Sequence, residues 1–332
     1  MTEAATQRSR SEMAGTELDL DMARYRRELT GYCYRMLGGA SEAEDAAQLT
    51  LVRAWQSIDR FEGRSTLRSW LYRIATNVCF DMLGASQRRA RPMDLTEARS
   101  AQTPLAPGLP DYVWIEPMPD SRTVAAGGDP AEVAVARETI RLAFVAALQH
   151  LPPRQRAVLI LREVLRWHAD EVAQLLETSV ASVNSALQRA RATLDSVGVA
   201  ATDTFAELDE EQRDLVDRYV DAFERYDIEA LIELIHEDAT MSMPPFDHWL
   251  RGKPDIAAWF TGPGAGCEGS RVVRTVANGS PAYAQYRPDP AGGHTAWALA
   301  VLEINHGRIA GLSSFLDVER LFPLFGLPLR ID

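Results

Sequence analysis

The sequence predicts a multidomain protein in which two all-α domains precede an α+β domain. Three observations lead to this prediction. Apolar residues recur at helical spacing through residues 19–91 and again through 130–197. Between these blocks, residues 92–129 lose the periodicity and are rich in proline. After Arg271 the apolar pattern changes from helices to strands, so the last domain, 205–332, combines helices with an antiparallel sheet.

Composition narrows the classes of protein that this chain can be. With 332 residues, 46% of them hydrophobic, it is globular and too long for one small core. A formal charge of −12 argues against a general nucleic-acid coat but permits a local basic surface. Cys33, Cys79 and Cys267 are isolated, so neither disulfides nor a metal site is predicted, and we expect no cofactor. Without a bilayer-spanning run or a secretory signal, and with a polar stretch at 1–18 expected to be disordered, the chain is predicted to be cytoplasmic with no membrane partner.

The first helical block contains a helix with a polar outward face. Ser41 followed by Glu44 predicts a capping box, and the helix that it opens runs to about Trp55. Leu49 and Val52 are expected to face mostly inward. The outward polar residues are Glu42, Asp45, Gln48 and Arg53.

A longer helix is predicted from Thr66 to about Ala85. Its exposed side is expected to interleave aromatic rings with arginines and an asparagine, and a basic end follows the helix. Such a surface suits single-stranded nucleic acid, because rings stack on unpaired bases while arginines follow the backbone. The alternative is a solvated helix face with a packed tyrosine. The candidate residues are Tyr72, Arg73, Asn77, Arg88 and Arg89.

A helix-turn-helix is predicted near the middle of the chain. Residues 168–176 form the first helix, 177–180 the turn and 181–194 the second helix. One apolar stripe of the second helix comprises Val180, Val183, Leu187, Ala190 and Leu194. The polar face comprises Ser182, Asn184, Ser185, Gln188, Arg189 and Arg191. Polar residues near the N-terminus suit base edges and arginines suit phosphates, whereas an ordinary amphipathic hairpin is the alternative. Because this face has no acidic residue before Asp195, it favours a polyanion partner.

Both helical blocks resemble one known family. The string at 41–48, with later matches through Trp70 and Asn77, resembles region two of bacterial RNA polymerase sigma factors, and of the extracytoplasmic-function (ECF) group in particular. The stretch 151–159 and matches up to Arg191 resemble region four. Both regions occur in the family's order.

The resemblance implies a function and its partners. It implies that core RNA polymerase binds the chain through the clamp helices of the largest subunit and through the flap, with Asp45 and Gln48 docking on the clamp. It also implies that region two opens and reads the minus-ten element of promoter DNA, while region four reads the minus-thirty-five element as duplex. The region-two residues implied in this way are Phe61, Arg64, Tyr72 and Asn77.

The proline-rich linker, 92–129, contains an apolar segment at 111–120. Tyr112 and Trp114 are too apolar for a solvated tether, because such residues usually dock on something. We expect them to pack on the C-terminal domain. Two alternatives are a path toward the polymerase and a small cluster under a loop.

The C-terminal extension is predicted to contain helices within 208–236 and at 253–260, followed by strands. The order and length of these elements resemble a SnoaL-like, NTF2-like cone, which implies an apolar pocket that holds a small molecule or a linker peptide; simple core is the alternative. Candidate lining residues are Tyr219, Met241, Met243, Phe246, Trp249, Trp259, Tyr283, Trp297 and Phe315.

The leading functional hypothesis is a sigma factor that directs promoter-specific initiation and is modulated in cis by its C-terminal domain. In this hypothesis that domain contacts the segment containing Tyr112 and Trp114 and sets how far apart the two DNA-binding domains sit. The first alternative is a SnoaL-type enzyme fused to DNA-binding helices. No catalytic residues are assigned, because no acid–base geometry is fixed for the available groups, which are His236, Asp238, Asp247 and His248. The second alternative, a one-component helix-turn-helix repressor, leaves the first helical block unexplained.

Overall fold

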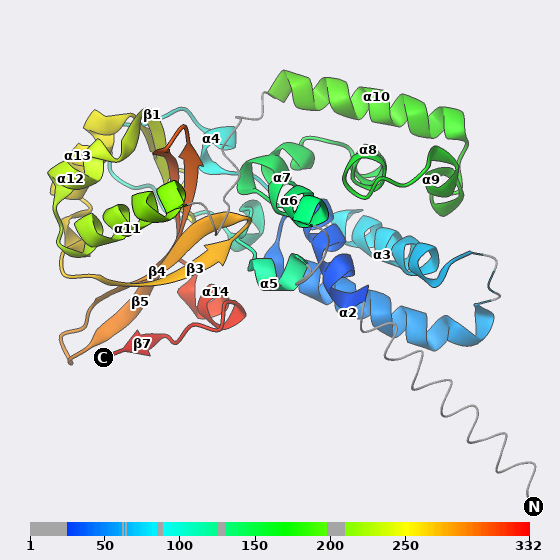
Figure 1. The fold of residues 1–332 in the computed structure, drawn as a ribbon, viewed down its shortest axis with the longest axis horizontal. Coiled ribbons are helices and arrows are strands. Elements are labelled where there is room, and N and C mark those ends of the chain that lie inside the picture. Colours follow the sequence, from blue (N-terminus) through cyan, green and yellow to red (C-terminus); the bar gives the residue numbers. More distant parts are fainter. Residues whose placement is uncertain (1–24, 62, 64, 85–88, 125–129, 198–209) are drawn as a thin grey trace, which may run out of the picture.

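The structure is a computed structural model of the whole chain. It describes residues 25–61, 63, 65–84, 89–124, 130–197 and 210–332. The expectation of disorder at 1–18 and the candidate residues Arg64 and Arg88 lie outside the described residues. Figure 1 shows the two helical domains packed side by side, with the C-terminal domain against one flank.

The N-terminal helical domain consists of a helix at residues 25–37, α2 (Ala40–Ser57), the 3₁₀ turn η1 (Ile58–Arg60) and α3 (Leu67–Gly84). The predicted cap of α2 is wrong, because the helix begins at Ala40 rather than after Ser41. Its first N–H groups instead meet a linker carboxylate: Glu116 accepts from the Ala40 N–H at 2.8 Å. A cap from a residue distant in sequence leaves no pattern next to the helix start, so the sequence could not predict it.

The linker forms only short elements, which are α4 (Pro92–Leu95), η2 (Asp111–Val113) and α5 (Asp120–Thr123). The helix-turn-helix domain then contains α6 (Pro130–Glu138), α7 (Leu142–Gln149), α8 (Pro153–Leu159), the π-helical turn η3 (Ile160–Val164), α9 (Ala169–Leu175) and α10 (Val180–Val197). The last two helices confirm the predicted helix-turn-helix. Glu177, in the turn between them, has φ of 51°.

The C-terminal domain is α+β, as predicted. Its helices are α11 (Glu210–Glu224), α12 (Ile228–Glu233), α13 (Lys253–Thr261), η4 (Ala265–Cys267) and α14 (Val318–Leu324). Its strands are β1 (Ile235–Ser242), β2 (Trp249–Arg251), β3 (Arg271–Ala277), β4 (Ser280–Pro288), β5 (His294–Asn305), β6 (Arg308–Phe315) and β7 (Arg330–Ile331). The sheet order is β2-β1-β6-β5-β4-β3, with β7 on β5, and β1 runs parallel to β6.

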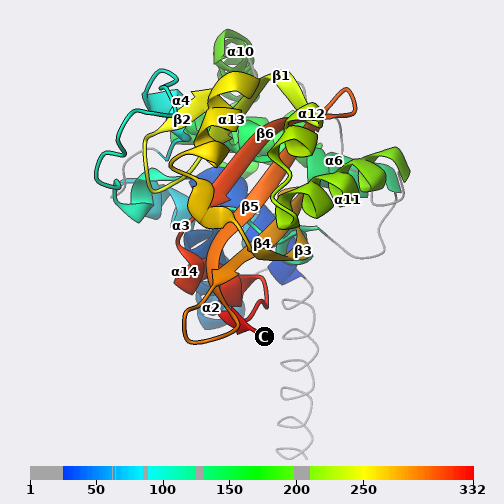
Figure 2. The ribbon, with the colours of Figure 1, turned by 90° about the vertical axis from the view of Figure 1, so that its left-hand side faces the viewer.

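The two faces of this sheet belong to different cores. One face, which includes Ala284, Leu299 and Phe315, joins a core that continues through the linker and both helical domains. The other face, which includes Tyr283 and Leu312, packs under α11, α12 and α13 (Figure 2). Because side chains alternate along a strand, neighbouring residues are committed to opposite cores. None of the helices in the described residues is long and apolar enough to span a membrane.

Candidate functional site

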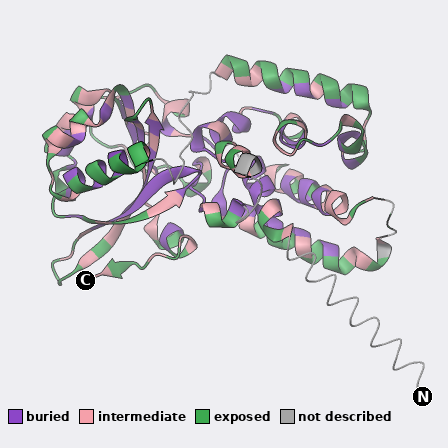
Figure 3. Cartoon of the chain, viewed as in Figure 1, coloured by how far each residue is buried: buried purple, intermediate pink, exposed green. Residues whose placement is uncertain are grey.

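The polar face of α10 is open to solvent. All six candidate residues are exposed: Ser182, Asn184, Ser185, Gln188, Arg189 and Arg191. Val183, Leu187 and Ala190 anchor the opposite side, whereas Val180 at the helix start is 43% exposed. Figure 3 shows that the outer side of α10 is exposed along most of its length. The helix therefore presents short polar groups near its N-terminus and arginines further on, which is the layout of a recognition helix.

A second exposed face lies on α2. Asp45, Gln48 and Arg53 are exposed, as predicted, whereas Glu42 is half-buried and pairs with Arg89. The expectation that Leu49 and Val52 face inward is wrong, because α3 covers only the alanine side of α2. The apolar residues that remain exposed on this helix are Leu49, Val52 and Trp55, with exposed fractions of 39%, 42% and 63%. Polar and apolar residues on one open face are typical of a protein-binding surface.

Tyr72, expected to be exposed on α3, is fully buried. Its ring lies 5.0 Å from that of Trp167, at the start of the helix-turn-helix, and its hydroxyl donates to Glu28 at 2.9 Å. The guanidinium of Arg68 lies over the Trp167 ring, 5.4 Å from its centroid. The prediction failed because the helix at 25–37, through Tyr32, covers one part of the Tyr72 ring and the helix-turn-helix domain, through Trp167, covers another. Helical periodicity cannot reveal such a cover.

The other candidates around α3 lie differently. Asn77 is exposed, and Arg73 is half-buried with its guanidinium 3.5 Å from the carbonyl oxygen of Gln174 in α9. Phe61 is half-buried against Trp70, with ring centroids 5.0 Å apart. Asn77 is thus accessible to a ligand, whereas Arg73 lies between the two helical domains.

Arg89, expected to hold DNA, is instead a buried structural cation with 5% of its side chain exposed. It pairs with Glu42, lies 3.7 Å from Glu116 and donates to the carbonyl oxygens of Asp111 and Trp114. The basic end of the first domain is therefore used to bind the linker, and the linker carboxylate of Glu116 helps to neutralise it.

Arg320, from α14, extends this network into the C-terminal domain. Its guanidinium lies 3.0 Å from Glu116, 3.3 Å from Asp111 and 3.3 Å from the hydroxyl of Ser41. Burial, only partly offset by the nearby Arg89, raises the pKa of the Glu116 carboxyl. One carboxylate thus caps α2 and contacts both an N-terminal and a C-terminal arginine.

The turn between β3 and β4 contains Asn278, which is fully buried and bonds to three other segments of the chain. Its side-chain amide donates to the Tyr34 hydroxyl and to the Ile140 carbonyl, both at 2.6 Å. Its side-chain oxygen accepts from the Met118 N–H at 2.8 Å, and its own N–H donates to the Met118 carbonyl at 3.0 Å. One side chain therefore links the N-terminal domain, the linker, the segment before α7 and the sheet.

The linker docks on the C-terminal domain, but not through the expected residues. The indole N–H of Trp249 donates to the Thr96 carbonyl at 2.9 Å, and Arg99 pairs with Asp247 at 2.9 Å. Tyr112 is half-exposed, and Trp114 lies in a bridge with Ala90 at the end of the N-terminal domain. In this segment the neighbouring residues Asp111, Glu116 and Met118 contact the C-terminal domain, through Arg320 and Asn278.

The C-terminal domain contains the predicted apolar pocket, a cavity of about 320 Å³. Of the candidates, Met241, Met243, Phe246, Trp259, Tyr283 and Trp297 line it. Three candidates do not. Tyr219 is packed into the core with its hydroxyl 3.2 Å from that of Tyr283, Trp249 is occupied by the linker, and Phe315 points to the opposite face of the sheet. Arg287, Cys267 and Leu105 were missed, since an arginine, a lone cysteine and a linker leucine carry no pocket signal in sequence.

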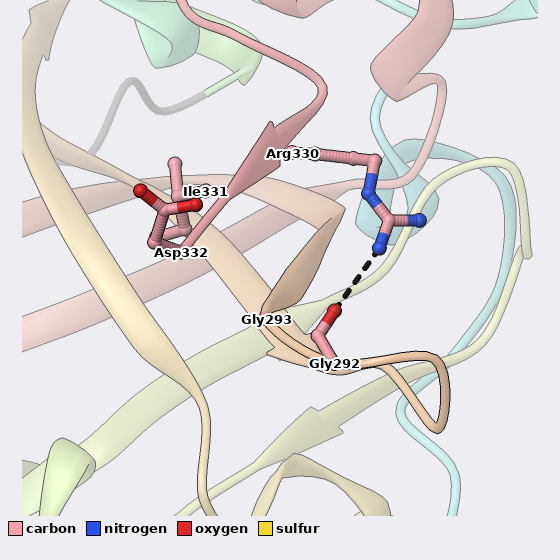
Figure 4. Close-up of a pocket in the computed structure, with 5 residues that line it drawn as sticks. All are labelled: Gly292, Gly293, Arg330, Ile331 and Asp332. Atoms are coloured by element: carbon pink, nitrogen blue, oxygen red, sulfur yellow. Dashed lines mark hydrogen bonds between the residues drawn. The ribbon is translucent and has the colours of Figure 1, made fainter.

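No carboxylate lies among the residues that line this cavity in the described part of the chain. Asp247 is paired with Arg99, and Asp238 is largely exposed beside Arg251. His248 is buried, and burial lowers its pKa, but it is not among the lining residues. A second hollow, at the C-terminal strand, is lined by backbone, Arg330 and Asp332, and Arg330 donates to the Gly292 carbonyl at 3.0 Å (Figure 4). Neither hollow offers an acid–base pair.

The fold and its exposed faces define a helical DNA-binding factor joined to a pocket-bearing α+β domain. Residues 22–89 match the family Sigma-70 region 2, 141–194 match Sigma-70 region 4, and 216–312 match the SnoaL-like domain. The ECF RNA polymerase sigma factor SigG of Mycobacterium tuberculosis is 44% identical over 308 residues, which cover 92% of this chain and 82% of that protein. The ECF sigma factor SigW of Bacillus subtilis is 32% identical over 170 residues, covering 51% of this chain and 82% of that protein.

The fold agrees with a solved structure along nearly its whole length. The crystal structure of the Mycobacterium tuberculosis ECF sigma factor SigJ matches with a TM-score of 0.59 and 20% identity, covering 95% of this chain and 99% of that one. The chain therefore belongs to the ECF RNA polymerase sigma factors and carries a SnoaL-like domain after region four. Sigma factors bind core RNA polymerase and promoter DNA.

Proposed function

We propose that this sigma factor directs promoter-specific initiation, in the cytoplasm, and that its C-terminal domain restrains it in cis by holding the two DNA-binding domains closed. The observation that carries the proposal is Asn278, which bonds at once to the N-terminal domain, the linker and the segment leading into α7. In the same arrangement Tyr72 is buried against Trp167. A closed chain cannot offer Tyr72 to a promoter base.

Docking on core polymerase is assigned to the open face of α2. Asp45 and Gln48 supply polar groups, while Val52 and Trp55 supply apolar area that a partner buries. In this proposal the face meets the clamp helices, and the helix-turn-helix domain meets the flap. This face stays exposed while the C-terminal domain is in place, so restraint acts on promoter reading rather than on docking.

Promoter recognition is assigned to two surfaces. On α10, Asn184, Ser185 and Gln188 read base edges, while Arg189 and Arg191 hold phosphates of the minus-thirty-five element. Arg191 now pairs with Glu163 at 2.5 Å, an exposed contact that a phosphate readily replaces. On α3, Asn77 and, once uncovered, Tyr72 meet the single-stranded minus-ten element.

Closed and open states must differ by a modest free energy for such a switch to operate. Moving a population from 1:99 to 99:1 requires about 5.5 kcal/mol. Each buried polar group that loses its partner costs about 1–3 kcal/mol, and Asn278 satisfies several groups at once. The free energies of the Asn278 contacts and of the Arg320 network together are therefore large enough to set the balance between the closed and open states.

Polymerase docking can be tested by pull-down with core polymerase. Asp45→Arg combined with Gln48→Ala is expected to abolish holoenzyme formation without changing the helical content. Asp214→Arg, an equal charge change on the exposed side of α11, serves as the control and should bind normally. Undiminished binding by the double variant would show that another surface docks, and would leave the restraint by the C-terminal domain to be judged separately.

The enzyme alternative is disfavoured by the absence of any carboxylate among the described residues lining the cavity. The repressor alternative does not explain why α2 exposes a face of mixed apolar and polar residues. A small-molecule ligand in the cavity remains part of the proposal, as the signal to which the C-terminal domain responds.

A further inference from the structure

The cavity of the C-terminal domain contains an arginine in an otherwise apolar wall. Tyr283, Gln285 and Arg287 alternate along β4, so their side chains reach the same face of the sheet and line the cavity together. Trp259, Phe246 and Met243 supply apolar walls. Arg287 is half-buried, so apolar walls replace part of the water around its guanidinium, and the charge favours a polar partner there.

The strand opposite is shaped to hold this arginine. The pairing of β4 with β5 shifts between Gln285 and Tyr286, so Trp297 is the extra residue of a β-bulge. A bulge redirects a side chain. Here the Trp297 ring lies under the guanidinium of Arg287, which is 3.4 Å from the ring centroid. The cation–π contact fixes the plane of the guanidinium without neutralising its charge.

The remaining contacts of Arg287 are weak. One terminal N–H donates to the sulfur of Cys267 at 3.1 Å, and sulfur is a poor acceptor. The buried Nε–H has no hydrogen-bond partner. Among the described residues none forms an ion pair with Arg287, and no lining residue carries a negative charge. The site therefore presents a planar donor fork with donors unused, which matches the two oxygens of a carboxylate.

We propose that the cavity binds a flat aromatic carboxylate, with its ring against the apolar walls formed by Trp259, Phe246 and Met243 and its carboxylate on Arg287. A volume of about 320 Å³ is at the lower end of the range of about 300–1,000 Å³ for ligand pockets, which favours one or two fused rings. The linker residue Leu105 lines the same cavity. Its neighbours are tied to the domain by the Leu109 N–H, which donates to the Pro245 carbonyl at 2.8 Å. Figure 2 shows the linker beside β2 and α13. A ligand in the cavity therefore contacts the linker at Leu105, and we expect its binding to alter the linker around this residue.

The charge preference can be measured on the full chain by titration calorimetry with 2-naphthoate and with its neutral isostere 2-naphthamide. We expect 2-naphthoate to bind at least about tenfold more tightly, because a hydrogen bond to a charged group is worth at least that factor. Equal affinities, or no binding of either probe at millimolar concentration, would overturn the proposal. This comparison needs no variant.

Variants of Arg287 test whether this residue causes the preference for the carboxylate. Arg287→Gln is expected to weaken 2-naphthoate about tenfold and leave 2-naphthamide unchanged, and the retained amide binding shows that the pocket is still folded. Arg287→Lys, which keeps the charge but loses the planar guanidinium, should bind 2-naphthoate with an affinity between those of the wild type and Arg287→Gln. Arg271→Gln, an equal charge change at an exposed position of β3, is the control and should bind like the wild type. Equal weakening of both probes by Arg287→Gln would mean that the arginine supports the fold rather than the ligand.

Transmission to the linker rests on the proposed function and is tested apart from it. Saturating 2-naphthoate should change hydrogen exchange in peptides covering 96–109. The neutral 2-naphthamide at equal occupancy should cause the same change, because the contact with Leu105 does not depend on the charge of the ligand. Binding with unchanged exchange would leave the carboxylate site standing and refute its link to the linker. A polymerase-docking failure would affect neither measurement.

Discussion

The C-terminal domain has two tight hairpin turns with nearly the same backbone and opposite surroundings. Asn278 and Gly279, between β3 and β4, have φ of 56° and 64°, and His306 and Gly307, between β5 and β6, have φ of 50° and 67°. Asn278 is fully buried between the helical domains and the linker, whereas His306 is exposed. The local turn chemistry is the same, so only the surroundings make one of the turns a joint between domains.

The largest difference between the two turns should follow from removing their first side chains. Asn278→Gly keeps the left-handed backbone but leaves the Met118 N–H without its acceptor. It also removes the donor to the Tyr34 hydroxyl, which keeps its own hydrogen bond to the Glu116 carbonyl. We expect loss of hydrogen-exchange protection at the Met118 amide equivalent to about 1–3 kcal/mol. His306→Gly should leave that amide unchanged. Equal protection in both variants would mean that Asn278 does not hold the joint.

The same two variants test whether Asn278 restrains transcription or only stabilises the fold. In run-off transcription with core polymerase, Asn278→Gly is expected to increase output at constant protein concentration, because Tyr72 becomes available. His306→Gly is expected to match the wild type. Reduced output from Asn278→Gly, with normal polymerase binding, would indicate that the closed arrangement is needed for activity.

A smaller effect is expected from the ion network beside the buried turn. Arg320→Gln removes contacts to Glu116 and Asp111, whereas Arg308→Gln, next to the exposed turn, removes a contact to the Glu233 carbonyl. The Arg320 side chain is 39% exposed, so water screens its pairs and we expect about 1 kcal/mol of destabilisation. Arg308→Gln should cost less than about 0.5 kcal/mol. Urea unfolding of both variants measures the difference, and a larger loss from Arg308→Gln would reverse the comparison.

The last effect concerns the pH dependence of stability. Burial raises the pKa of Glu116, so the folded chain holds this proton more tightly than the unfolded chain. The resulting stabilisation is complete below the ordinary pKa near 4.5 and is lost as the pH rises through the raised value. In urea unfolding at a series of pH values, Glu116→Gln should therefore gain stability relative to the wild type above pH 4.5, with a slope of at most about 1.4 kcal/mol per pH unit. A relative loss would show that attraction to Arg89 and Arg320 outweighs burial.

Sequence patterns predicted the parts of the protein whose signals are local. The periodicity of α10 separated its buried stripe from its exposed polar face, and the proline-rich linker marked the division between the helical domains. The resemblance added the family, which the relatives confirm. The α+β character of the last domain followed from the change in apolar spacing, although β1 and β2 were not predicted and β1 begins at the end of a segment predicted to be helical.

The failures occurred where one domain covers another. Tyr72 and Arg89 have the composition of a nucleic-acid surface, but Trp167 covers the first and the linker surrounds the second. Conversely, Leu49 and Val52 have core composition and stay exposed, because the buried side of α2 is its alanine side, against α3. Periodicity identifies faces of a helix, and it carries no record of which face a distant segment covers.

The closed arrangement is tested most directly by the distance between the two helical domains in solution. Spin labels can be placed on cysteines introduced at Gln56 in α2 and at Ser196 in α10, both exposed, while the native cysteines are buried. We expect one narrow distance distribution for the otherwise wild-type chain and for His306→Gly, and a broad distribution extending to longer distances for Asn278→Gly. A narrow, unchanged distribution in the Asn278→Gly chain would contradict the claim that this turn holds the DNA-binding domains together.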